Sequence, residues 1–120
     1  MTELKNDSLT ITMTDRPPVK VSKKVWTLVA QAKDWDGEFE CQANRTWKVS
    51  VRECQRNGDD RCIVYGSFYS GWSGEDTISA GVIIDNINDA PNAIKDIVEQ
   101  INGSNTLTQS CIADLPAEEI

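Results

Sequence analysis

The chain has 120 residues, the size of one domain, so we expect residues 1–120 to form a single domain with its own core. The formal net charge is −7, and a chain of this sign repels nucleic-acid phosphates and anionic membrane surfaces. Charge and composition therefore disfavour nucleic-acid and membrane binding. They are compatible with a protein partner or a small-molecule ligand.

The termini are predicted to be peripheral. Residues 1–8 are polar and are expected to form a flexible arm, and residues 104–120 a C-terminal extension. The N-terminal residues have no apolar segment typical of a secretory signal, and no run of about eighteen apolar residues occurs. We therefore expect a cytoplasmic protein, in which the four cysteines are free thiols.

Alternating residues predict a first strand over residues 9–14, ended by two prolines at positions 17 and 18. Residues 23–35 fit two structures. Their apolar positions 25, 28, 29 and 32 would share one face of a helix, whereas the run Val-Trp-Thr-Leu-Val favours a strand. Two lysines at positions 23 and 24 would oppose a helix dipole, so the strand is preferred.

Four further strands are predicted, over residues 38–43, 47–52, 62–69 and 77–84. The second of these alternates most regularly, and Asn57-Gly58 between it and the next strand is a hairpin signal. The chain then contains one clear amphipathic helix, over residues 90–101. Asn88 or Asp89 can cap it, Pro91 lies in its first turn, and Asn102-Gly103 ends it. A short strand is expected over residues 107–112.

This order predicts an α+β fold. We expect an antiparallel β-meander sheet of about five to six strands, with one amphipathic C-terminal helix packed on one face.

The chain contains no histidine, which removes the Ser-His-Asp and Cys-His catalytic arrangements and the histidine-based zinc sites. Residues 71–74 read Gly-Trp-Ser-Gly, close to the nucleophile-elbow pattern, but Glu75 stands where that pattern requires glycine. We therefore predict no catalytic residue, no metal site and no cofactor. An enzyme that uses only Asp and Arg side chains is a minor alternative.

Cys54 and Cys62 flank the Asn-Gly hairpin, and two registers are open. A three-residue loop would place the two cysteines directly opposite each other, close enough for a disulfide. A two-residue loop would instead place Cys54 opposite Arg61. Reduced thiols are the expected state.

Aromatic residues alternate with Ser and Gly between Tyr65 and Gly74, a composition that binding loops use. The alternative is a structural loop in which Trp72 covers the core. The candidate partner-binding or ligand-binding residues are Phe68, Tyr69, Trp72 and Glu75, together with Trp35 in a neighbouring turn and Arg52.

Two functional hypotheses follow. The first is a small acidic, non-catalytic interaction protein that binds, and inhibits or regulates, another macromolecule. The second is a small-molecule or nucleotide-binding protein, with a homodimer building its site between subunits.

Overall fold

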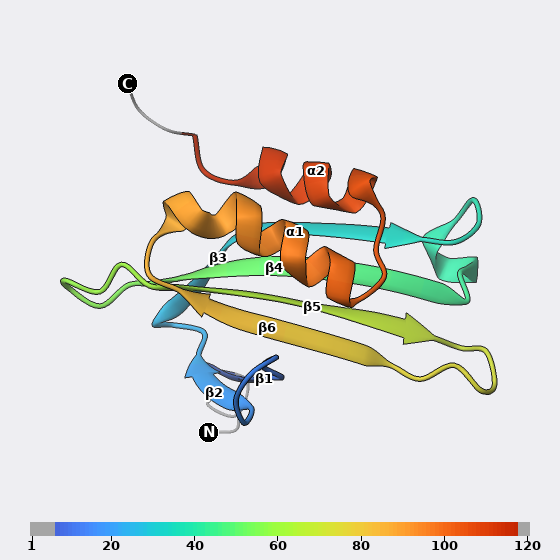
Figure 1. The fold of residues 1–120 in the computed structure, drawn as a ribbon, viewed down its shortest axis with the longest axis horizontal. Coiled ribbons are helices and arrows are strands. Elements are labelled where there is room, and N and C mark those ends of the chain that lie inside the picture. Colours follow the sequence, from blue (N-terminus) through green and yellow to red (C-terminus); the bar gives the residue numbers. More distant parts are fainter. Residues whose placement is uncertain (1–6, 118–120) are drawn as a thin grey trace.

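The computed structural model describes residues 7–117 and contains two antiparallel sheets and two α-helices (Figure 1). The larger sheet is a four-stranded meander in the order β3-β4-β5-β6, and the smaller is a β1-β2 hairpin. The strands are β1 (Ser8–Ile11), β2 (Val19–Ser22), β3 (Trp26–Trp35), β4 (Arg45–Cys54), β5 (Cys62–Ser70) and β6 (Ile78–Ile84). The predicted α+β class and antiparallel meander are confirmed. The prediction of five to six strands in one sheet is wrong, because two strands form a sheet of their own.

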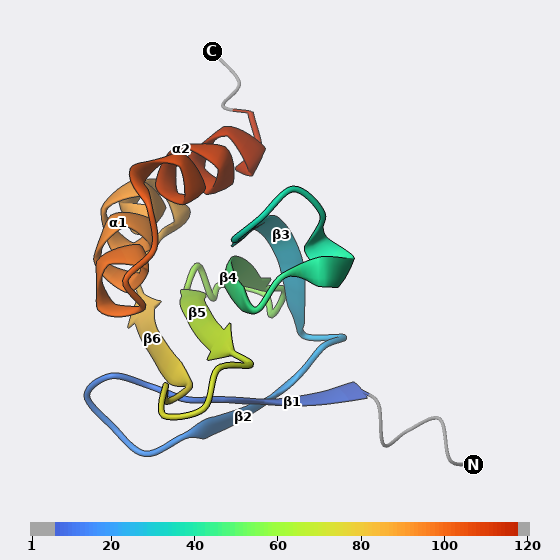
Figure 2. The same cartoon turned by 90° about the vertical axis from the view of Figure 1, so that its right-hand side faces the viewer.

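The central sheet is covered on its two faces by different elements. Helices α1 (Ala90–Gln100) and α2 (Asn105–Asp114) pack on one face, and the β1-β2 hairpin lies against the other (Figure 2). Successive strand residues point to opposite faces, so Val49 and Val51 of β4 join the helix-side core. The hairpin-side core contains Ile11, Trp26 and Ile63.

A β-bulge in β3 lies between Leu28 and Ala30. On one side of it Trp26 packs into the hairpin-side core, and on the other Ala30 and Ala32 pack into the helix-side core. The extra residue, Val29, shifts the side-chain alternation by one position, so the strand changes the face that it buries. The segment is a strand, as preferred, and the exposed Leu28 shows that the helix-like spacing in the sequence reflects no buried helix face.

Three local predictions are wrong. Residues 38–43 form a loop with a 3₁₀ turn at Glu40–Gln42 and no buried residue, so their alternation reflects no sheet face. Residues 107–112 belong to α2, whose N-cap Ser104 accepts a hydrogen bond from the Leu107 N–H at 3.3 Å. Strand β2 was not expected, because the prolines before it were interpreted as the end of strand structure.

The two ends of the described chain are tied into the fold. The predicted arm, residues 1–8, lies mostly outside the described residues, but Ser8 begins β1 and Asp7 forms an ion pair with Lys24 at 3.2 Å. The predicted C-terminal extension contains α2, which buries Leu107 and Cys111. No helix among residues 7–117 is long and apolar enough to cross a bilayer.

The amphipathic helix α1 begins and ends close to the predicted boundaries. Pro91 lies in its first turn, and its apolar stripe, Ala90, Ile94, Ile97, Val98 and Ile101, is buried. Asn102 adopts a left-handed φ of 59° just after the helix, the conformation in which helices commonly end.

The β4-β5 register separates the hairpin cysteines. Cys62 pairs with Glu53, and the Cys54 N–H donates to the Arg61 carbonyl at 3.0 Å. Cys54 lies in the hairpin-side core and Cys62 in the helix-side core. Both are free thiols, because the register directs their side chains to opposite faces of the sheet.

Candidate interaction surface

Two loops lie side by side at one end of the central sheet (right-hand end of Figure 1). The β3-β4 loop spans residues 36–44 and the β5-β6 loop spans residues 71–77. They are joined directly, since the Gly71 N–H donates to the Asn44 carbonyl at 2.7 Å. The strand order makes them neighbours. In an antiparallel meander every second connection lies at the same end of the sheet, so the β3-β4 and β5-β6 loops share one end.

Arg45, the first residue of β4, links both loops. Its Nε donates to Glu75 Oε1 at 2.9 Å and its Nη2 to Glu75 Oε2 at 3.0 Å, a two-point contact. Its Nη1 also lies 3.8 Å from Asp36 Oδ2. The Glu75 carboxylate additionally accepts a hydrogen bond from the Ser70 hydroxyl. These contacts hold the pKa of Glu75 below its ordinary value, with the Arg45 hydrogen bonds as the largest cause.

Asp36 closes the β3-β4 loop on itself. One of its carboxylate oxygens accepts the N–H groups of Asn44 and Arg45 at 2.9 and 3.0 Å, and its own N–H donates to the Arg45 carbonyl at 3.1 Å. Gly37 follows with a φ of 88°, which favours glycine. The Asp36 carboxylate is therefore occupied by contacts within the loop.

Large apolar side chains are exposed at this end of the sheet. Phe39 is 53% exposed, Tyr69 60% and Trp72 51%, and they are three of the four exposed large apolar side chains among residues 7–117. The Arg45 guanidinium carbon lies 6.0 Å from the centroid of the Trp72 ring. We call Phe39, Tyr69 and Trp72, with the Arg45–Glu75 pair between the loops, the aromatic platform.

The predicted site residues are divided between this end and the rest of the sheet. Tyr69, Trp72 and Glu75 lie at this end, where Trp72 and Glu75 both lie beside Arg45. Phe68 is buried on the helix side, with its ring centroid 5.2 Å from that of Trp47. Trp35 lies in the row that crosses the sheet through Thr46 to Tyr69, on the opposite face from Phe68, and is only partly exposed.

Arg52 lies away from the platform. It faces the β1-β2 side, where its Nε donates to the Tyr65 hydroxyl at 2.9 Å and its Nη1 to the Trp26 carbonyl at 3.0 Å. These bonds occupy its guanidinium with contacts inside the fold.

Sequence reasoning missed one platform residue, Phe39. Phe39 was placed on a strand, where alternation would direct it to a core. A signal was present in the short acidic segment around it, because glutamates at 38 and 40 beside Gly37 are more typical of a loop than of a strand.

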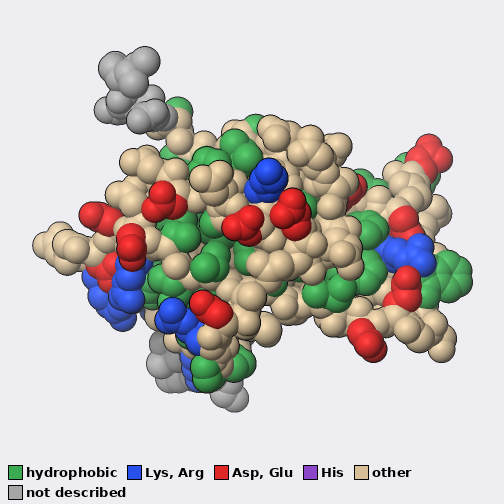
Figure 3. All heavy atoms as spheres, in the orientation of Figure 1, with side chains coloured by type: hydrophobic (Ala, Val, Ile, Leu, Met, Phe, Trp, Pro, Cys, Tyr) green, Lys and Arg blue, Asp and Glu red, His purple; other side chains and the backbone are tan. Residues whose placement is uncertain are grey.

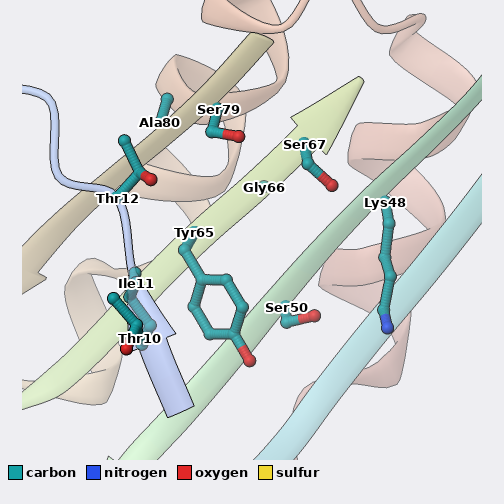
Figure 4. A pocket seen from close by; sticks show the side chains of 10 residues that line it. All are labelled: Thr10, Ile11, Thr12, Lys48, Ser50, Tyr65, Gly66, Ser67, Ser79 and Ala80. Carbon is teal, nitrogen blue, oxygen red and sulfur yellow. The ribbon is translucent and has the colours of Figure 1, made fainter. Parts of the chain in front are cut away.

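Apart from the aromatic platform, a cavity of about 210 Å³ lined largely by polar residues lies between β1 and the central sheet. Figure 4 shows the hydroxyls of Ser50, Ser67 and Ser79 and the Lys48 side chain rising from neighbouring strands, with Thr10 on the hairpin side. The Lys48 amine forms no ion pair with the residues that the structure describes. Hydroxyl and amino donors of this kind can bind an oxyanion.

Comparison with known proteins identifies no relative. No protein family, curated protein or solved structure matches this chain. Within residues 7–117, no group of three or more Cys, Asp or Glu side chains is arranged to hold a metal ion. The function is therefore inferred from the geometry of the chain itself.

Proposed function

We propose that this protein is a non-catalytic interaction protein that binds another protein through the aromatic platform. The observation that carries the proposal is the exposure of Phe39, Tyr69 and Trp72 at one end of the sheet, on two loops and the adjoining end of β5, where Arg45 and Glu75 join the loops. Exposed aromatic side chains that cluster at one place on a protein are typical of protein–protein contact sites, because their burial supplies much of the binding free energy.

The fixed geometry of the loops supports the proposal. Binding by a flexible loop loses conformational entropy, and this loss weakens the affinity. Here the hydrogen bonds of Arg45, Asp36 and Gly71 hold both loops before any partner arrives. The platform is therefore preorganised for binding.

The charges around the platform indicate a basic partner surface. Glu38 and Asp76 lie in the same two loops, whereas Glu40 is paired with Lys33 at 3.4 Å and Arg45, which begins β4, is paired with Glu75. Complementary charge would speed the encounter and fix the orientation. A binder of this kind regulates or inhibits its partner by covering a basic surface of it.

The test is a comparison of two exposed apolar side chains. The immobilised chain is used to isolate a partner from the native host, and the affinity of the purified partner is then measured with two variants. Trp72→Ala should weaken binding at least about tenfold, as truncation of an aromatic hot spot does. Leu28→Ala is the matched control, because Leu28 is 44% exposed but lies on β3 outside the platform. Equal affinity of the two variants would contradict the proposal.

The polar cavity supports a second candidate function, the binding of a small anionic molecule such as a nucleotide. Lys48 would pair with the anion and Ser67 and Ser79 would donate hydrogen bonds. A ligand that binds only the folded state raises the melting temperature, so a thermal-shift screen with phosphate and nucleotides tests it. The shift should disappear in Lys48→Met and persist in Lys95→Met, which changes an exposed lysine on α1. No shift with any of these compounds would exclude this function.

A further inference from the structure

The two edge strands of the central sheet differ in their protection. Edge strands expose unpaired backbone groups and are normally blocked by charged residues, bulges or covering elements. Strand β3 has all three devices: the bulge at Val29, Lys33 and Asp34 near its end, and a hydrogen bond from the Gln31 N–H to Asp114 of α2 at 2.9 Å. Strand β6 reads Ile-Ser-Ala-Gly-Val-Ile-Ile, with neither a charge nor a proline.

Only the middle of the β6 edge is covered. The Gly81 carbonyl accepts from the Thr14 N–H at 2.9 Å, and the Gly81 N–H donates to the Thr14 hydroxyl at 3.2 Å. Backbone groups two residues apart point to the same side of an antiparallel strand, so the N–H and carbonyl of Ile83 also point outward. Neither group forms a hydrogen bond with any residue in the described range 7–117.

Apolar side chains are partly exposed beside these free groups. Val82, Ile83 and Ile84 are each half-buried, and with Ala93 of α1 they line a groove of about 380 Å³. In Figure 3 hydrophobic side chains gather at the C-terminal end of β6, with acidic and basic side chains around them.

The groove has an acidic rim. Asp85, Asp89 and Asp96 line it, and all three are exposed. The Arg61 guanidinium interacts electrostatically with Asp85, but it is already paired with Asp59 at 2.8 Å. The rim therefore keeps negative charge available for a partner.

We propose that the Val82–Asp85 end of β6 binds a short extended segment of another protein that alternates apolar and basic residues. The segment adds a strand to the sheet: its backbone pairs with the free groups of Ile83, its apolar side chains pack beside Ile83 on the hairpin face, and its Lys or Arg side chains lie over the groove on the helix face, toward the aspartates of the rim. A second copy of this chain fits less well, because each copy carries a net charge of −7 and the same acidic rim.

This site goes beyond the proposed function and does not depend on it. The free end of β6 leads into α1, at the end of the sheet opposite to the aromatic platform (Figure 1). The two sites share no residue, so each proposal can be tested, and can fail, without the other.

The experiment uses a fluorescent heptapeptide of alternating lysine and valine and the full-length chain. Fluorescence anisotropy should show binding, and the Ile83 amide should exchange with solvent more slowly in the complex. The same peptide with N-methylated valines keeps its charge but loses backbone donors, so it should bind at least about fivefold more weakly if a strand is added. Equal binding of both peptides would overturn the proposal, because it would indicate charge attraction alone.

Charge variants test the acidic rim without altering the core. Asp85→Asn and Asp96→Asn should each weaken peptide binding about two- to fivefold, the effect of one exposed charge. Glu99→Gln is the matched control, since Glu99 is an exposed acid on α1 that does not line the groove. An equal loss in all three variants, or no binding up to about 1 mM peptide, would contradict the site.

Two controls separate this site from its alternatives. Trp72→Ala should leave peptide binding unchanged, because Trp72 lies at the other end of the sheet. A loss of peptide binding in this variant would assign the peptide to the aromatic platform and overturn the proposal. Sedimentation of the free chain at rising concentration tests the second copy as occupant: a dimer with a protected Ile83 amide would overturn it as well.

Discussion

At the scale of single residues, Arg45 and Glu75 join two segments that lie thirty positions apart in the sequence. Each was visible as a charged residue, and Glu75 was predicted as a site residue, but nothing in the sequence pairs them. Their contact depends on the meander, which returns β5 beside β4 and brings Arg45 opposite Ser70. Gly81 also depends on tertiary structure, because its close neighbours, Thr12 and Met13, come from a distant part of the chain.

Acid should loosen the platform. The pKa of Glu75 lies below its ordinary value of 4.5 because of Arg45 and Ser70, so the contact stabilises the loops above that pH. This contribution is lost as the pH falls through the lowered pKa of Glu75. The Trp72 indole N–H signal in NMR should therefore shift only when the pH falls below the ordinary range of a glutamate carboxyl group.

The Glu75→Gln variant is the control for this titration. Glutamine has no carboxylate to protonate, so the Trp72 signal should lose its acid titration. An unchanged titration in Glu75→Gln would show that another group controls the loop.

A methyl group at position 81 should separate the hairpin from β6. A Cβ at Gly81 would lie 2.6 Å from the Thr12 carbonyl oxygen and 3.2 Å from the Met13 sulfur. Gly81→Ala should lower the free energy of unfolding by about 1–3 kcal/mol, measured by urea denaturation. Gly71→Ala is the comparison, because its nearest neighbour would be at 3.6 Å and the change should be below about 0.5 kcal/mol. Equal losses would show that close approach does not decide the effect.

At the scale of elements, regular alternation was a reliable guide only where the segment pairs with another strand and packs against a core. The strands over residues 47–52, 62–69 and 77–84 correspond to β4, β5 and β6, each of which contributes side chains to the helix-side core. The segment 38–43 alternates equally well but is a loop, because no element covers either side of it. Alternation is necessary for a half-buried strand, but pairing partners decide whether one forms.

Helix α2 shows the opposite error, because a strand was predicted over residues 107–112 and a helix forms. Its N-cap hydrogen bond stabilises the helix in spite of the β-branched residues in this segment. Ser104 accepts from the Leu107 N–H at 3.3 Å, and its hydroxyl donates to Asp34 of β3 at 3.0 Å. Ser104→Ala should lower the free energy of unfolding by about 1 kcal/mol. Ser110→Ala, in the exposed middle of the same helix, should leave it unchanged or slightly higher, because alanine is the better helix former. Thermal unfolding compares the two, and an equal loss would argue against the cap.

At the scale of the whole molecule, the central sheet separates two apolar cores and distributes the cysteines between them. Cys62 and Cys111 lie on the helix side, Cys54 lies on the hairpin side, and Cys41 is exposed in the β3-β4 loop. Burial raises the pKa of Cys62 to about 11 and that of Cys111 to about 12. The thiols of Cys62 and Cys111 thus remain protonated near neutral pH.

Thiol labelling should report this arrangement. At pH 8 a water-soluble maleimide should modify Cys41 rapidly in the folded protein, and the three buried cysteines only after addition of denaturant. Mass spectrometry of the intact protein counts the labels. The Cys41→Ser variant should remain unlabelled until it unfolds, and rapid labelling of it under native conditions would show that one of the cores opens.

The sequence by itself determined the α+β class, the helix over residues 90–101 and most strands of the meander, because these follow from local periodicity and end signals. It also contains no histidine, and it pointed to Tyr69, Trp72 and Glu75 as candidate site residues. Only the tertiary structure decided that β1 and β2 form a separate sheet, that a bulge turns β3 over, and that Phe39 and Arg45 join the platform. These features depend on pairing between distant segments, and local periodicity cannot encode which segments meet.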